Sequence, residues 1–148
     1  MFATNQQYDG LVAILGNDQM KGSVESPFDF ITLANKGIDA DVIVNFRKHF
    51  KISRSVTAQL LDVSEPTLYR WIREHKKLDR RYSIQLFELT NLFLFGSEVF
   101  GKQENFFKWL EIPNVALGGM QPIKLLELPE GISKVKDLLG RIEHGVIS

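Results

Sequence analysis

Residues 106–145 read FFKWLEIPNVALGGMQPIKLLELPEGISKVKDLLGRIEHG, and they combine aromatic anchors, backbone breakers and apolar stripes in a dense order. The helix end at Trp109-Leu110 is followed by a rigid turn at Pro113-Asn114 and by Gly118-Gly119, which permit backbone shapes that other residues avoid. After Leu117 and Pro122, which belong to this turn and loop, apolar residues recur at helical spacing, at Leu125, Leu126, Val135, Leu138, Leu139 and Ile142. The stretch predicts short helices and a tight loop packed over the tryptophan.

The preceding chain is also helical in pattern. Residues 1–25 form a variable, glycine-punctuated segment with one apolar cluster, Leu11 to Leu15, which fits a short helix or strand. Ser26 can cap a helix that begins at Pro27 and stops at Gly37. The next helices are expected from an Asp39 cap to Phe50, from Ser83 to Val99, from Lys102 to Leu110, from Pro122 to Leu126 and from Pro129 to His144, with an irregular loop at Ile112–Gly119. The fold class is therefore all-α.

Composition narrows the class of protein. The chain has 148 residues, 44% of them hydrophobic, which is enough for one compact domain or two small units. It contains no cysteine, so disulfides, thiolate metal sites and cysteine nucleophiles are excluded. No window is long and apolar enough for a membrane span, and the start does not resemble a signal peptide. We expect a soluble cytoplasmic protein that has no membrane partner.

A strong charge asymmetry lies beneath a net charge of zero. Residues 47–81 carry ten Lys or Arg against four acids, a local charge of +6, whereas the remainder carries eight bases and fourteen acids. Attraction to a polyanion depends on the charges near the contact rather than on the total. The basic third of the chain is therefore a candidate nucleic-acid surface.

The same basic third contains a pair of short helices. Ser53 can cap a helix that ends near Leu61, and Ser64 can cap a second helix from Glu65 to His75 whose first turn holds Pro66. Leu68 and Trp71 give the second helix an inward face. The pair resembles the helix-turn-helix of Xre-type DNA-binding proteins, with Asp62 in place of the usual turn glycine. Aspartate tolerates a left-handed backbone better than most residues, so this departure is compatible with the turn.

In a helix-turn-helix, the start of the second helix enters the major groove of DNA. Glu65, Thr67 and Arg70 then point outward, with Arg70 as the first choice for a base or phosphate contact. The predicted DNA-binding residues are Arg54, Ser64, Glu65, Thr67, Arg70, Arg73, Lys76 and Lys77, with Arg80 and Arg81 as further phosphate contacts. The alternative is a solvated basic surface on a plain helical hairpin, and we favour DNA binding because the motif and the charge coincide.

The sequence contains one segment that resembles a nucleotide-binding loop and three histidines that could serve a catalytic or metal site. Gly96 to Gln103 matches a phosphate-binding loop at every position except the last, where Gln103 replaces the hydroxyl that contacts magnesium. This segment follows an apolar helix rather than a strand, so Gly96 is expected to permit close packing and Gly101 to end a helix. The three histidines lack partners at metal-site or triad spacing. We predict no enzyme, no cofactor and no metal site, and expect saturable ATP binding only if the rejected loop is functional.

At the C-terminal stretch the sequence closely resembles the toxin-binding region of the Xre/MbcA/ParS antitoxins. The pattern runs WL, PN.ALGG..P..LL, then G...V..LL.RIE.G, and SPFDFITLANKGI, the helix pair and the long helix precede it in the family's order. The residues that carry this structural motif are Trp109, Pro113, Asn114, Leu117, Gly118, Gly119 and Pro122. Leu128 departs from the pattern because a capping threonine is common there, which concerns the start of the last helix.

The resemblance implies an antitoxin of a type II toxin-antitoxin pair, encoded beside a RES-domain toxin that consumes NAD or transfers ADP-ribose from it. It implies two tasks: dimeric binding to operator DNA, which represses the operon, and neutralisation of the toxin. In this family the chain's end reaches the toxin's NAD pocket. Carried over, the toxin-binding residues are Arg141, Ile142, Glu143, His144, Gly145, Val146, Ile147 and Ser148.

Three regions follow from this interpretation: a variable segment at 1–25, a helix-turn-helix region at 26–82, and a linking or dimerisation helix with the toxin-binding domain at 83–148. The alternative is a stand-alone dimeric helix-turn-helix transcriptional regulator whose C-terminal unit binds another protein or only dimerises. The neighbouring reading frame discriminates between them, because only the first requires a toxin there.

Overall fold

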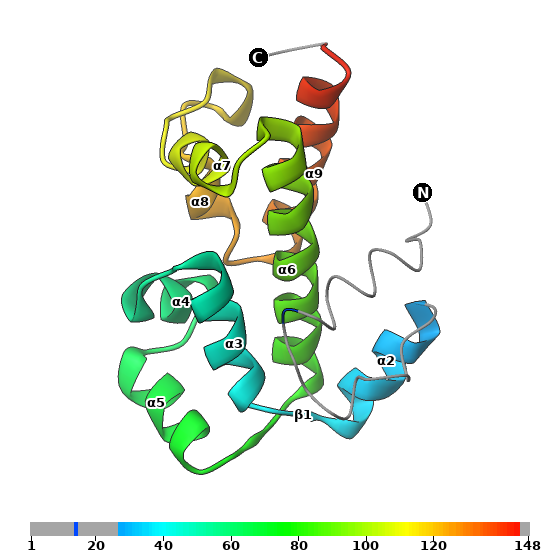
Figure 1. Ribbon diagram of the computed structural model, residues 1–148, viewed down its shortest axis with the longest axis vertical. Coiled ribbons are helices and arrows are strands. Elements are labelled where there is room, and N and C mark those ends of the chain that lie inside the picture. The colour runs from blue at the N-terminus through cyan, green and yellow to red at the C-terminus, as the bar shows by residue number, and fades with distance from the viewer. Residues whose placement is uncertain (1–13, 15–26, 146–148) are drawn as a thin grey trace. The chain divides into compact units, whose positions relative to one another are not determined.

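The computed structural model describes Ile14 and residues 27–145, and it is mainly helical with one two-stranded sheet (Figure 1). The predicted all-α class is confirmed. The predicted Ser26 cap and the Leu11–Leu15 cluster, apart from buried Ile14, lie outside the described residues. In chain order the elements are α2 (Pro27–Lys36), β1 (Ile38–Asp39), α3 (Asp41–Phe50), α4 (Arg54–Leu60), α5 (Glu65–Arg73), β2 (Lys77–Leu78), α6 (Arg80–Phe100), α7 (Gln103–Leu110), η1 (Val115–Leu117), α8 (Pro122–Leu125) and α9 (Pro129–Glu143).

The chain forms two compact units, residues 1–87 and 88–148, which divide within α6. Each unit holds one of the two tryptophans, Trp71 in the first and Trp109 in the second. None of the described helices is long and apolar enough to cross a membrane. The functional boundary predicted after residue 82 stays a prediction.

The first unit is built around apolar faces of α3 to α5 and a short sheet. Phe46 and Ile43 of α3 are almost fully buried, as are Leu60 and Leu61 at the end of α4. β1 pairs with β2 antiparallel, with Ile38 opposite Leu78 and Asp39 opposite Lys77. The sequence pattern predicted only helices here, so this short sheet was not expected. Each strand has only two residues, so no alternating pattern could indicate it.

Two predicted helix starts differ from the structure. α6 begins at Arg80 rather than at Ser83, which is buried and donates its hydroxyl to the Leu78 carbonyl at 3.4 Å. Ala40, rather than Asp39, occupies the cap position of α3. Asp39 still helps to begin this helix, because its Oδ1 accepts the Asp41 N–H at 2.9 Å. The predicted stop at Gly37 is confirmed, since this residue has φ +84° directly after α2.

The second unit has an aromatic core centred on Phe106 of α7. Its ring lies 5.8 Å from Phe93 and 6.2 Å from both Phe100 and Trp109, measured between ring centroids. Gly96 of α6 faces Phe106 so closely that a Cβ there would overlap the ring. The expected close packing at Gly96 is thus confirmed, and Gly101, with φ +80°, follows α6 as expected. Gly96 to Phe100 are helical, which is not the geometry of a phosphate-binding loop.

The last helix packs through its own glycine. Leu126, Val135 and Leu139 are almost fully buried, and Gly131 of α9 lies directly against the Leu125 backbone of α8. Leu128 occupies the cap position without a side-chain hydrogen bond, so the threonine cap common in the resembled pattern is absent. α9 instead begins with Pro129, whose missing N–H costs little in a first turn. The second unit therefore fixes α9 by packing rather than by capping.

Candidate functional site

The helix-turn-helix predicted in the first unit is confirmed as α4 and α5. The Ser53 hydroxyl accepts the Val56 N–H at 3.1 Å, and the Ser64 hydroxyl accepts the Thr67 N–H at 3.2 Å, so both predicted caps form. Asp62 has φ +56° and thus adopts the left-handed backbone of the usual turn glycine. α5 ends at Arg73, two residues before the predicted end.

The second helix of the pair has the predicted inward and outward faces. Leu68 and Trp71 are buried, whereas Glu65 and Arg70 are exposed and Thr67 is half-buried. The Ser64 hydroxyl also donates to Thr67 Oγ1 at 2.8 Å, which holds both side chains at the start of α5. This end of the helix presents short polar groups and a long cation, the groups that contact base edges and phosphates.

Three of the predicted cations lie over aromatic rings. The guanidinium of Arg54 lies 4.6 Å from the ring centre of Tyr69, and the ammonium of Lys76 lies 5.6 Å from that of Trp71. The guanidinium of Arg81 lies 5.2 Å from the ring centre of Tyr82 and also pairs with Asp62 at 3.5 Å. Within this unit, exposed cations include Arg70, Arg73, Lys77 and Arg80. The first unit therefore places most of the predicted cations at its surface, three of them in contact with aromatic rings.

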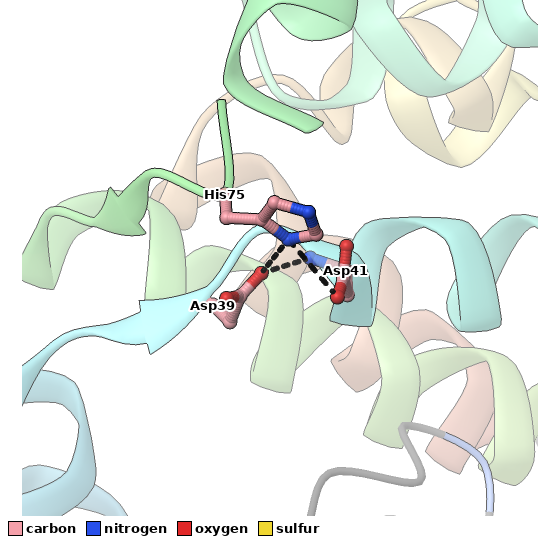
Figure 2. A network of polar contacts seen from close by, with 3 residues as sticks. All are labelled: Asp39, Asp41 and His75. Atoms are coloured by element: carbon pink, nitrogen blue, oxygen red, sulfur yellow. Dashed lines mark hydrogen bonds and ion pairs between the residues drawn. The ribbon is translucent and has the colours of Figure 1, made fainter. Parts of the chain in front are cut away.

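A polar cluster in this unit was not expected from the sequence. His75 Nδ1 lies 3.4 Å from Asp41 Oδ2 and 3.8 Å from Asp39 Oδ1, and Figure 2 shows the imidazole turned toward both carboxylates. The β1–β2 pairing brings the three residues together, and the Ala40 N–H donates to the Lys76 carbonyl at 2.9 Å. Their ligand atoms lie within 4.8 Å of one another, so the group has the donor types of a metal site.

The cluster has a structural role that requires no ion. The contact of the His75 ring with Asp41 links the segment after α5 to the start of α3, and His75 itself adopts a left-handed backbone with φ +51°. No sequence spacing indicates this cluster, because the sheet brings together residues that are far apart along the chain. The side chains of His75 and Asp41 are exposed, whereas that of Asp39 is half-buried.

The motif residues of the C-terminal stretch build a closed loop between α7 and α8, residues 111–121, hereafter the α7–α8 loop. Asn114 pairs with Met120 in an antiparallel bridge, and its side chain accepts the Ala116 N–H at 2.9 Å. Gly118 and Gly119 have φ +67° and +84°, the left-handed conformations that glycine allows. Gln121 Nε2 donates to the Glu111 carbonyl at 2.6 Å and fastens the loop's ends.

The remaining motif residues anchor this loop to the helices. Trp109 lies 5.4 Å from Phe100 between ring centroids, and Pro122 is buried in the first turn of α8. Leu117 and Asn114 are half-buried, whereas Pro113, Gly118 and Gly119 are exposed. Trp109 is half-buried and contacts rings of α6 and α7, so the packing of the last helices over this residue stays a prediction, and the loop itself stands at the surface.

The predicted toxin-binding residues begin at the end of α9. Arg141, Glu143, His144 and Gly145 are exposed and Ile142 is half-buried, whereas Val146, Ile147 and Ser148 lie outside the described residues. Gly145 has φ +73°, so the chain turns after the helix.

Elsewhere in the second unit, burial raises the pKa of the Glu88 carboxyl in α6, and the positive charge of Lys136 on α9 opposes that rise.

Two family models match the chain, one in each half. Residues 29–93 match the antitoxin Xre-like helix-turn-helix domain, and residues 96–145 match the antitoxin Xre/MbcA/ParS C-terminal toxin-binding domain. The boundary between the two matches falls inside α6. Together they span both the helix pair and the whole α7–α9 region described above.

Individual proteins show the same likeness. The chain is 26% identical over 132 residues to the Prs ADP-ribosylating antitoxin of Sphingobium sp. (strain YBL2), covering 83% of each chain. It is 42% identical over 55 residues to antitoxin Xre of Yersinia enterocolitica, covering 37% of this chain and 34% of the relative.

A solved structure shares the fold. It is a chain in the crystal structure of the M. tuberculosis MbcT-MbcA toxin-antitoxin complex, with a TM-score of 0.57 and 19% identity, covering 74% of this chain and 96% of that one. At this identity the likeness concerns the fold alone. The two family matches, in the order expected from the sequence, show that the chain belongs to the Xre/MbcA/ParS family of antitoxins.

Proposed function

We propose that the chain neutralises a RES-domain toxin encoded by the adjacent gene, an enzyme that consumes NAD, and that its last residues obstruct the toxin's active site. The observation that carries this proposal is the match of residues 96–145 to a toxin-binding domain. The solved structure that shares the fold is a toxin-antitoxin complex, which supports a toxin as the partner. We infer that the chain acts by binding rather than by catalysis, since the named relatives are antitoxins.

The exposed end of α9 supports a blocking role for residues 141–148. Arg141 and Glu143 offer charged groups, and Gly145 turns the backbone beyond the helix. A short tail with charged, glycine and apolar residues can fill a concave cofactor site while its backbone groups remain available for hydrogen bonds. The cleft that we propose the tail fills is the NAD site of a RES-type toxin.

A chain that ends at Gly140 is expected to lose most of its inhibition of the toxin. The measurement is NAD consumption by the purified toxin, titrated with the full and the shortened chain, together with protection of cells that express both partners. Circular dichroism must first show that the shortened chain keeps its helices. Equal inhibition by the two chains contradicts the proposed role of the tail.

The second proposed task is repression of the chain's own operon through the helix-turn-helix. Its support is the coincidence of the α4–α5 geometry with the basic surface on one unit. A dimer is proposed because a helix-turn-helix dimer reads two half-sites about one helical turn of DNA apart. Each half of a palindromic operator then meets one copy of α5.

Replacing Arg70 and Arg73 together by alanine is expected to weaken operator binding by about tenfold or more, because two phosphate or base contacts are lost. The slope of log affinity against log salt should fall by roughly 1 to 2. A matched control replaces Lys108 and Lys134, exposed cations of the second unit, and removes the same charge. If the arginine variant keeps both its operator affinity and its salt slope, the proposal that this surface binds DNA is wrong.

The alternative, a stand-alone dimeric regulator, makes a different prediction about partners. Co-expression with the product of the adjacent reading frame, followed by size measurement, separates the two. A stable complex of the two proteins fits the antitoxin, whereas a homodimer that ignores the neighbouring product fits the regulator. A complex that also binds operator DNA fits both proposed tasks.

A further inference from the structure

The α7–α8 loop exposes apolar side chains that the core does not use. Val115 is 95% exposed, Ile112 59% and Met120 46%, and together they make up half of the large exposed hydrophobic residues in the described chain. No charged residue lies between Glu111 and Lys124. A surface segment that has exposed apolar side chains and no charged residues resembles the centre of a protein–protein interface more than an ordinary surface loop.

The loop is also fixed in shape. The Asn114–Met120 bridge closes it, the Asn114 N–H donates to the Met120 carbonyl at 3.0 Å, and the Gly119 N–H donates to the Asn114 carbonyl at 2.9 Å. Met120 pairs with the residue that precedes Val115, so the two side chains leave the loop from neighbouring positions. A preformed loop binds a partner without a large loss of conformational entropy.

A loop that only joined α7 to α8 would not need these side chains. The bridge, the Asn114 side-chain bond and the two left-handed glycines already specify its path, and none of them involves the side chain of Ile112, Val115 or Met120. Polar side chains at these exposed positions would join α7 to α8 equally well and would make the protein more soluble than apolar ones do. Their apolar character therefore requires an explanation outside the monomer.

We propose that the α7–α8 loop is a toxin contact in its own right, with Val115 as its central anchor, and that it supplies affinity while the tail supplies inhibition. This inference rests on the proposed function. The loop lies wholly inside residues 96–145, the part that matches a toxin-binding domain, which names the toxin as the occupant. Exposed Glu111 and Lys124 border the uncharged segment and form its polar rim. The matching toxin surface is therefore apolar at its centre.

The test is Val115→Asp, measured for binding to the purified product of the adjacent reading frame by calorimetry. The dissociation constant should rise about tenfold or more, because a charge replaces an anchor in a desolvated contact. The side chain is almost fully exposed, so the thermal unfolding midpoint should stay unchanged. Val115→Ser is a milder second variant, expected to weaken binding in the same direction.

Leu128→Asp is the matched control, since Leu128 is 56% exposed in the same unit and the substitution adds the same charge outside the loop. It should leave toxin binding unchanged, and aspartate at this cap position should favour α9. The chain ending at Gly140 should still form the complex while failing to inhibit.

The possible outcomes distinguish failure of the loop contact from failure of the proposed antitoxin function. Unchanged binding by both Val115 variants overturns the loop contact and leaves the antitoxin function standing. Equal weakening by Val115→Asp and Leu128→Asp also overturns it, because the effect then belongs to added charge rather than to the loop. Failure of the unaltered chain to bind overturns the proposed function itself, and the loop contact with it.

Discussion

Phe106→Ala is expected to lower the free energy of unfolding of the second unit by about 3–5 kcal/mol. Phe106 is 0% exposed and touches aromatic neighbours from α6 and α7, among them Phe93 and Trp109. Its removal loses the transfer free energy of the ring and leaves a cavity that the surrounding rings cannot fill. Gly96 has no side chain to move into the space, so little relaxation is available.

Urea unfolding followed by tryptophan fluorescence measures this effect. A Trp71→Phe background leaves Trp109 as the only tryptophan, so the signal reports the second unit. Val115→Ala is the control in the same unit, because Val115 is 95% exposed and its truncation should change stability by no more than about 0.5 kcal/mol. A loss below about 1 kcal/mol for Phe106→Ala would contradict an aromatic core centred on this ring.

Local signals predicted the elements that the site depends on. Ser53, Ser64 and Asp62 specify the turn between α4 and α5 through side-chain caps and one left-handed residue, and the structure has all three. Gly37 likewise predicted the end of α2, and Pro122 predicted the start of α8. Such features involve residues within a few positions of one another, so the chemistry of a short stretch determines them.

What could not be predicted depends on residues far apart along the chain. The β1–β2 pairing joins Ile38 to Leu78, and the cluster of Asp39 with His75 follows from it. The start of α6 was misplaced for a more local reason, because the Ser83 hydroxyl donates to the Leu78 carbonyl five residues earlier and does not cap the helix. The exposure of Val115, by contrast, is non-local, since an apolar residue in a loop is usually assigned to the core.

The two glycines of α9 are expected to respond to alanine with opposite signs. A Cβ on Gly131 would overlap the Leu125 carbonyl oxygen, a backbone atom that cannot rotate away, so Gly131→Ala should destabilise the second unit by about 3 kcal/mol. A Cβ on Gly140 meets nothing within 4 Å, and Gly140→Ala should stabilise the unit by about 0.5–1 kcal/mol because alanine loses less backbone entropy in a helix.

The pair is its own control, since both substitutions add one methyl group to the same helix. The measurement is the urea midpoint of each variant in the Trp71→Phe background, followed by titration of the toxin. Because α9 carries the residues proposed to block the toxin, Gly131→Ala should also weaken inhibition of the toxin, whereas Gly140→Ala should preserve it. Equal shifts in one direction would mean that the approach of α9 to the Leu125 backbone does not hold this helix in place.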